Sequence, residues 1–246
     1  MSRKVILFIV EGYADVKALS KIFTDCIEKD ELLVEFYQTG GDILTDWFKP
    51  EIDVKARVDA CLKDFLKRNP VFKRKDIVRI VQITDMDGAY VSNEKIMLDG
   101  KREKVYYDDG CIWCRNPEKI KNRNLTKQAA LYKLVNTGIV SKDIPYSIYY
   151  MSCNLDHVLY DERNLPDSDK VEKANEFELE FGDNVFNVKQ FFHARNVPVK
   201  SFKASWNFIE EGNHSLSRFT NIELLLDELG NENWNEAEID DKSIKS

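Results

Sequence analysis

The sequence lacks the features that define several large classes of protein. No stretch reaches the roughly 18 consecutive apolar residues that a membrane helix needs, so we expect no membrane-spanning segment. The five cysteines are an odd number and lie scattered along the chain, which argues against a disulfide framework. There is no Gly-rich phosphate loop of the Walker type, and this weakens the case for a phosphotransferase that acts on nucleotides.

An excess of positive charge is also lacking, since the formal net charge is -7 with 32% charged residues. This balance argues against a protein that coats DNA without specificity. It does not exclude a nuclease, because a local basic strip can lie beside an acidic metal site. Hydrophobic residues make up 43% of the 246 residues, which is enough for one large α/β domain, or for a smaller domain with an elaborated remainder.

Short apolar runs alternate with helical patterns over the first two thirds of the chain. The runs have the continuous apolar character of strands buried on both faces of a parallel sheet. We expect four such strands, at residues 4–10, 32–37, 77–84 and 146–151. Apolar residues at helical spacing predict the helices between them, at 16–27, 54–65 and 126–135. This order predicts an α/β fold, a parallel sheet flanked by helices.

The chain is expected to divide into three parts. Residues 1–165 would form the α/β domain, with a polar insertion around 89–124, after which Asn124 or Thr126 would cap the next helix. The first apolar run is too short for a signal peptide, so we expect a cytoplasmic protein. Helical patterns then predict an extension over 166–230, with helices at 168–181, 184–195 and 220–229, before a polar tail at 231–246.

Acidic residues follow three of the four predicted strands. Glu11 comes directly after the first strand, Asp85 and Asp87 after the third, and Asp156 shortly after the fourth. Because the carboxyl ends of parallel strands share one edge of a sheet, we expect these side chains to gather in one pocket. Clustered carboxylates repel each other and need a compensating cation. An all-oxygen ligand set favours a hard ion, and Mg²⁺ is the natural one when phosphates complete its shell.

Two of these strand ends resemble the motifs of the Toprim family. The run Ile9–Val16 (IVEGYADV) is similar to the first Toprim motif, a strand ending in Glu-Gly, and Ile83–Gly88 (ITDMDG) resembles the second, a strand followed by DxD. The helix, strand and helix between them are also in the Toprim order. Met151–Leu159 resembles the fourth-strand region of Toprim nucleases related to the OLD family and to small stand-alone anti-phage Toprim proteins. The resemblance covers residues 3 to about 165.

The resemblance implies a Toprim-like (Rossmann-like) catalytic domain that binds Mg²⁺ or Mn²⁺. It implies that Glu11 binds metal or acts as a general acid or base, that Asp85 and Asp87 hold the metal, and that Asp15 supports a second ion. Many of the similar nucleases carry a glutamate where this chain has Asp156, so a helix-capping or first-turn role for Asp156 is as well supported as metal ligation. The implied activity is a divalent-metal-dependent endonuclease that hydrolyses phosphodiester bonds, and by analogy a toxic effector of prokaryotic antiviral defence.

Each of these acids also has a structural explanation. Glu11 and Asp15 could be acids that the helix macrodipole favours, and Asp85 and Asp87 could be turn residues ahead of Gly88. The alternative function is a noncatalytic Toprim-like partner subunit that binds nucleic acid or protein. The sequence leaves open whether a substrate is DNA or RNA (including tRNA), whether a regulatory protein restrains the chain, and whether it forms a homo-oligomer.

Basic and aromatic residues in the insertion are candidates for binding nucleic acid. Lys101 and Arg102 precede Tyr106 and Tyr107, and a mixture of basic and aromatic residues suits a single strand. Such runs are usually solvated faces, so the pattern is mild support.

Two further pairs of residues are weaker candidates. Lys200 and Lys203 lie in a polar segment after a predicted helix and could bind nucleic acid or stabilise charge in a transition state, although solvated surface lysines are the better explanation. Cys111 and Cys114 form a CxxC, but no second ligand pair has suitable spacing for zinc.

Overall fold

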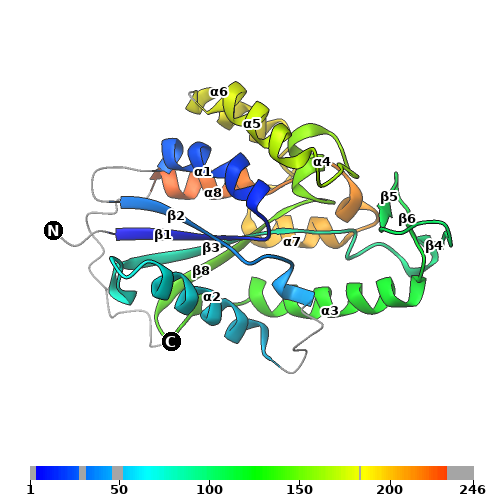
Figure 1. The fold of residues 1–246 in the computed structure, drawn as a ribbon, viewed down its shortest axis with the longest axis horizontal. Coiled ribbons are helices and arrows are strands. Elements are labelled where there is room, and N and C mark those ends of the chain that lie inside the picture. Colours follow the sequence, from blue (N-terminus) through cyan, green and yellow to red (C-terminus); the bar gives the residue numbers. More distant parts are fainter. Residues whose placement is uncertain (1–3, 28–31, 46–51, 183, 232–246) are drawn as a thin grey trace.

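A five-stranded sheet forms the centre of the protein. The computed structural model describes residues 4–27, 32–45, 52–182 and 184–231. The strands lie in the order β2-β1-β3-β8-β7, in which all but the edge strand β7 run parallel (Figure 1). Their bounds are β1 Lys4–Val10, β2 Leu32–Gln38, β3 Ile77–Asp85, β7 Ile139–Val140 and β8 Ile144–Met151. The four predicted strands and the mixed α/β fold with a parallel-rich sheet are therefore confirmed.

Helices cover both faces of the sheet and make three layers (Figure 1). One layer packs on Ile6 and Phe8 of β1, and contains α1 (Tyr13–Ile27), α4 (Leu155–Tyr160), α5 (Lys170–Phe181), α6 (Val185–His193) and α8 (Ile222–Asn231). The other packs on Val5 and Leu7, and contains α2 (Val54–Arg68), α3 (Pro117–Val135) and α7 (Phe202–Glu210). Successive side chains of a strand point to opposite faces, so both sets are buried and the strand is apolar throughout.

The helix α3 begins earlier than the sequence pattern indicates. It starts at Pro117, and its cap is Asn116, whose side chain accepts a hydrogen bond from Lys119 N at 3.1 Å. The predicted caps, Asn124 and Thr126, are wrong, because both lie inside this helix. The first two turns are polar where they face solvent, which hides their helical period, whereas proline at the first position suits a helix start.

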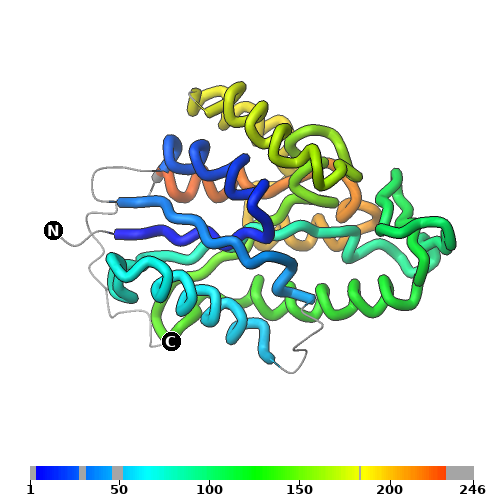
Figure 2. The backbone as a smooth tube through the Cα atoms, in the orientation of Figure 1, coloured from blue at the N-terminus to red at the C-terminus, as the bar shows by residue number. Residues whose placement is uncertain are grey.

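The insertion after β3 is consequently shorter and more regular than expected. Residues 89–116 contain a small sheet of three strands in the order β4-β6-β5. These are β4 (Ile96–Leu98), β5 (Tyr106–Tyr107) and β6 (Ile112–Cys114). The backbone trace shows the insertion beyond one end of the central sheet, next to the start of α3 (Figure 2). It packs through its own small apolar cluster, which includes Ile112 and Leu216.

The C-terminal helices complete the layers around the same sheet. The predicted helices at 168–181, 184–195 and 220–229 correspond to α5, α6 and α8, while α4 and α7 were not predicted. Between α6 and α8 the chain returns to the sheet, where Thr220 forms isolated bridges with Met151 and Asn196. None of the helices in the described ranges has the length and apolar character needed to span a membrane. The predicted tail from residue 232 onward lies outside those ranges.

Candidate functional site

Glu11 and Asp85 meet where two neighbouring strands end. Glu11 directly follows β1, and Asp85 is the last residue of β3, its neighbour in the sheet. Thr84 Oγ1 and Asp85 N both donate hydrogen bonds to Glu11 Oε1, at 3.2 and 3.3 Å. Asp85 Oδ1 in turn accepts a hydrogen bond from Leu155 N, at 2.8 Å, at the start of α4. The structure thus brings together two of the four acids that the sequence placed in one pocket.

Asp87 lies close by but is held by partners of its own. Tyr107 OH donates to Asp87 Oδ1 at 2.8 Å, and Lys127 Nζ donates to Asp87 Oδ2 at 2.7 Å. Its backbone adopts a left-handed conformation with φ of 53°, and its N–H donates to Cys153 O at 2.6 Å. Both carboxylate oxygens and the backbone N–H of Asp87 therefore have protein partners.

Lys127 is a buried cation between two acids. Its side chain is 0% exposed, and Nζ lies 2.7 Å from Asp87 Oδ2 and 3.1 Å from Asp42 Oδ2. Burial opposes ionisation of Asp87, but the positive charges of Lys127 and Arg123 outweigh it and lower the pKa of Asp87 to about 2. Burial likewise opposes the charged form of Lys127, but Asp42 and Asp87 hold its pKa well above the ordinary value. The negative charge of Asp42 and Asp87 is therefore offset by a cation of the protein itself.

Glu11 and Asp85 have no such partner. In the described part of the chain neither carboxylate has a Lys, Arg or His within ion-pair distance. Burial, followed by the charge of Asp42, raises the pKa of Glu11 from 4.5 to about 8. Burial and the charge of Glu11 raise the pKa of Asp85 well above its ordinary value. These two half-buried carboxyl groups thus lack a direct ion-pair partner, and the more distant charge of Lys127 only partly offsets the rise in their pKa values, an arrangement typical of functional sites.

Asp15 and Asp156 lie beside this pair with local structural roles. Asp15 Oδ2 accepts a hydrogen bond from Gly12 N at 2.8 Å, at the start of α1. Asp156 lies in the first turn of α4, where its Oδ2 pairs with Lys170 Nζ at 3.0 Å. Burial raises the pKa of both carboxyl groups, against the opposing effects of the Gly12 N–H and of Lys170. The helix-start explanation therefore accounts for their contacts, and metal ligation by either residue stays a prediction.

The residues at this edge suit a magnesium ion that is held through few protein ligands. Across the described ranges, no three His, Cys, Asp or Glu side chains form a group that could hold a metal ion as they are placed. Mg²⁺ does not require such a cage, because it keeps several waters and binds through one or two carboxylates and the phosphates of a substrate. The carboxyl groups of Glu11 and Asp85 are adjacent and have no direct ion-pair partner, which fits that mode. Asp87 could bind the ion only after one of its carboxylate oxygens loses its hydrogen bond from Tyr107 or Lys127.

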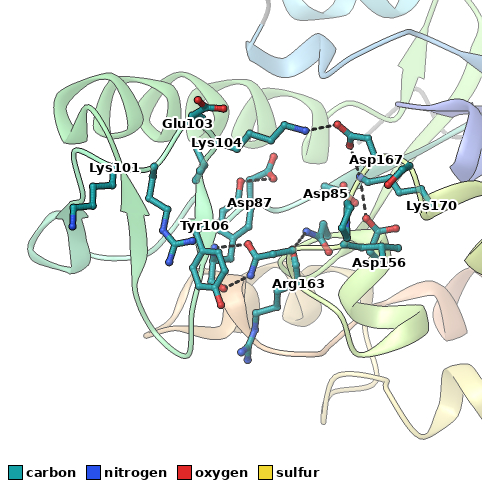
Figure 3. Close-up of a pocket in the computed structure, with 18 residues that line it drawn as sticks. Asp85, Asp87, Lys101, Glu103, Lys104, Tyr106, Asp156, Arg163, Asp167 and Lys170 are labelled. Atoms are coloured by element: carbon teal, nitrogen blue, oxygen red, sulfur yellow. Dashed lines mark hydrogen bonds and ion pairs between the residues drawn. The ribbon is translucent and has the colours of Figure 1, made fainter.

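A cavity of about 800 Å³ opens over Asp85 and Asp87 (Figure 3). One wall is residues 101–107 of the insertion, and the opposite wall is residues 163–170, between α4 and the start of α5. Five basic residues line it, namely Lys101, Arg102, Lys104, Arg163 and Lys170. The structure therefore places the predicted Lys101 and Arg102 at the candidate site. Lys200 and Lys203 are not among the lining residues, and Lys203 lies in α7.

Sequence reasoning missed the role of Arg123 and Lys127, which both donate hydrogen bonds to Asp87. Arg123 Nη2 donates to Asp87 O at 2.7 Å, and its Nη1 donates to Tyr107 OH at 3.1 Å. One signal was available, since Asn124 and Lys127 interrupt the apolar face of α3. That face otherwise consists of Ile120, Ala130, Leu131 and Leu134. A lysine in an apolar helix face is rarely fully buried unless it is paired, so it marks a buried acid nearby.

The CxxC of the insertion shows no third ligand. Cys114 is buried, and its thiol donates to Met97 O at 3.7 Å. Burial raises the pKa of the Cys114 thiol, which disfavours the thiolate that zinc would need. Cys111 and Cys114 belong to no metal-binding group in the part of the chain that the structure describes.

The fold and the site define a three-layer α/β protein with an acidic cluster at the carboxyl edge of its parallel strands. No protein-family model, no curated protein and no solved structure matches this chain significantly. The likeness to Toprim nucleases therefore rests on the two motifs and on the order of the elements between them.

Proposed function

We propose that this protein is a Toprim-like endonuclease that uses Mg²⁺ or Mn²⁺ to hydrolyse phosphodiester bonds of a nucleic acid. The observation that carries this proposal is the pair of Glu11 and Asp85 at the end of adjacent strands, which has raised pKa values and no direct ion-pair partner. Asp85 lines a cavity with basic residues on its walls, which could receive a phosphodiester. A bound divalent cation would polarise the scissile phosphate and lower the pKa of an attacking water.

Residues around the proposed metal site would supply proton transfer, positioning and positive charge. Glu11 has a pKa of about 8 without a metal, so it can hold or release a proton near neutral pH, as a general acid or base must. The hydrogen bonds from Asp85 N to Glu11 and from Leu155 N to Asp85 hold both carboxylates in place. Arg163 and Lys170 line the opposite wall, where they pair with Asp109 and Asp156, and would stabilise the phosphodiester by exchanging these acids for its oxygens.

The wider role rests on the resemblance alone. By analogy with similar nucleases, the protein would be a toxic effector of prokaryotic antiviral defence that acts in the cytoplasm. A regulatory protein partner that restrains or triggers it, and assembly as a homo-oligomer, belong to the same proposal.

One observation favours a second function, a noncatalytic partner subunit that binds nucleic acid or protein. Both carboxylate oxygens of Asp87 are engaged by Tyr107 and Lys127, and in the described ranges no ready-made metal group exists. In this alternative, Lys127 would replace a metal permanently, and the acidic edge would be a structural feature.

Cleavage assays separate the two functions. The protein is incubated with Mg²⁺ or Mn²⁺ and with plasmid, single-stranded DNA, total RNA or tRNA. We expect cleavage by the native protein, loss of cleavage with EDTA, and loss in both Glu11→Gln and Asp85→Asn. The matched control is Glu94→Gln, an exposed acid in the insertion, which should cleave normally. Cleavage that survives both site variants would contradict the proposal, and circular dichroism checks that each variant is folded.

A further inference from the structure

The two walls of the cavity are joined to each other across its opening. Tyr107 N donates to Asn164 Oδ1 at 2.8 Å, and Asn164 Nδ2 donates to Tyr107 O at 2.7 Å. Lys104 Nζ pairs with Asp167 Oδ2 at 2.5 Å, also from one wall to the other (Figure 3). These contacts are exposed and individually weak, but together they hold the two walls at the present width, which favours a narrow ligand over Asp85.

The adjacent tyrosines of one wall have different roles. Tyr107 is held by hydrogen bonds within the protein, because its OH donates to Asp87 and accepts from Arg123. Tyr106 lines the cavity, and the guanidinium carbon of Arg102 lies 4.0 Å from the centre of its ring. A planar cation stacked on an aromatic ring makes an extended flat surface on which a nucleobase can stack. Lys101 also lines the cavity, toward the outer end of the insertion, and adds positive charge there (Figure 3).

We infer that the cavity binds single-stranded polynucleotide, with a base on the Tyr106–Arg102 stack and the backbone between the two walls, where basic residues alternate with acids. This inference rests on the proposed function, because it names the substrate class of the same site. A cavity of about 800 Å³ has the size of a site for a small organic ligand. That space accommodates one strand with an unstacked base, whereas the two strands of a helix would have to separate the joined walls.

Binding without cleavage tests the inference directly. Fluorescence anisotropy is measured in EDTA with labelled single-stranded DNA and RNA oligonucleotides, and with blunt hairpin duplexes of the same length. We expect the full chain to bind at least one single strand about tenfold more tightly than the duplexes. Removal of one base–aromatic stack costs on the order of tenfold in affinity, so Tyr106→Ala should weaken single-strand binding by about that factor. Tyr106→Phe, which keeps the ring, should recover most of the loss.

The matched control is Tyr132→Ala on α3, which removes a tyrosine that is 74% exposed and does not line the cavity. It should bind like the native chain, and thermal melting checks that all variants fold. Equal affinity for duplex and single strand, an unchanged affinity in Tyr106→Ala, or no binding to any oligonucleotide would each overturn the inference. The relative affinity of the DNA and RNA strands identifies which polymer the cavity prefers.

The outcomes also separate this inference from the proposed function. Tight single-strand binding without cleavage under any metal would contradict the endonuclease and support the inference. Metal-dependent cleavage of duplexes that Glu11→Gln abolishes, with no preference for single strands, would do the reverse.

Discussion

Two pairs of carboxylates lie at the carboxyl edge of the sheet, and the protein balances them differently. Asp42 and Asp87 share the buried ammonium group of Lys127, at 3.1 and 2.7 Å. Glu11 and Asp85 share only a hydrogen bond from the Asp85 backbone, and the pKa values of both are raised. The first pair is part of the folded framework, while the second has no direct ion-pair partner and keeps its protons to a higher pH unless a cation binds. We therefore expect a cation to bind at Glu11 and Asp85, next to the pair that already has Lys127 as its cation.

The largest expected effect comes from removing the cation of the balanced pair. Lys127→Met should lower the free energy of unfolding by about 3–5 kcal/mol, because it leaves buried acids without their partner. The control is Lys133→Met on the same helix, where a half-exposed lysine pairs with Asp53 and should contribute less than about 1 kcal/mol. Urea denaturation measures both. Equal losses in the two variants would show that Lys127 does not balance the pair.

The second prediction concerns the pH dependence that the pair of Glu11 and Asp85 creates. The folded protein keeps a proton on Glu11 up to a pKa of about 8, whereas the unfolded chain loses it near 4.5. Stability from this group is therefore full below pH 4.5 and falls as the pH rises through 8, with a limiting slope of about 1.4 kcal/mol per pH unit.

Glu11→Gln carries no titrating group at this position, so its stability should depend less on pH in that window. The variant should become more stable than the native protein as the pH approaches 8. Urea denaturation from pH 5 to 8, without divalent ions, measures the difference. Parallel pH profiles for the two proteins would rule out the raised pKa of Glu11.

The third prediction tests the hydrogen bonds that surround Asp87. Tyr107→Phe removes the hydroxyl that donates to Asp87 and accepts from Arg123, and should cost about 1.5–3 kcal/mol of stability. Tyr106→Phe, one residue earlier, removes a hydroxyl that has no such role and should be close to neutral. Thermal or urea unfolding compares them, and a larger loss in Tyr106→Phe would contradict the assigned partners.

The smallest effect, and the most specific, is stabilisation by added metal. With Mg²⁺ at about ten times its dissociation constant, the native protein should gain about 1.4 kcal/mol, which is a rise of a few degrees in melting temperature. Asp85→Asn should lose this response. Asp42→Asn, which changes the balanced pair, should keep it. A melting temperature that Mg²⁺ leaves unchanged in the native protein would contradict a cation site at Glu11 and Asp85.

The strands and the meeting of Glu11 with Asp85 could be predicted because they follow from local patterns and a general rule. Continuous apolar runs mark buried parallel strands, and the ends of such strands share one edge. The sequence does not show that β1 and β3 are neighbours in the sheet. Connection rules allow only a few strand orders, however, and only some of these place the acids side by side.

The partners of Asp87 could not be predicted in the same way. Lys127 reaches Asp87 from 40 residues along the chain, through a helix whose polar start resembles a loop. The segment between them forms a small sheet from strands of only two or three residues, which are too short to show a period. Long-range pairing of this kind depends on tertiary packing, and no local pattern encodes it.

The turn at Gly88 ties the site to a distant part of the chain. Gly88 N and Cys153 N both donate to Ser215 O, at 3.1 and 3.0 Å, and a Cβ atom at Gly88 would lie only 2.7 Å from Leu216. During synthesis the acids leave the ribosome well before Ser215 does, so the nascent chain holds them without the contacts that set their geometry. A completed site would thus arise late in translation, and the growing polypeptide would lack the cation site proposed for the finished protein.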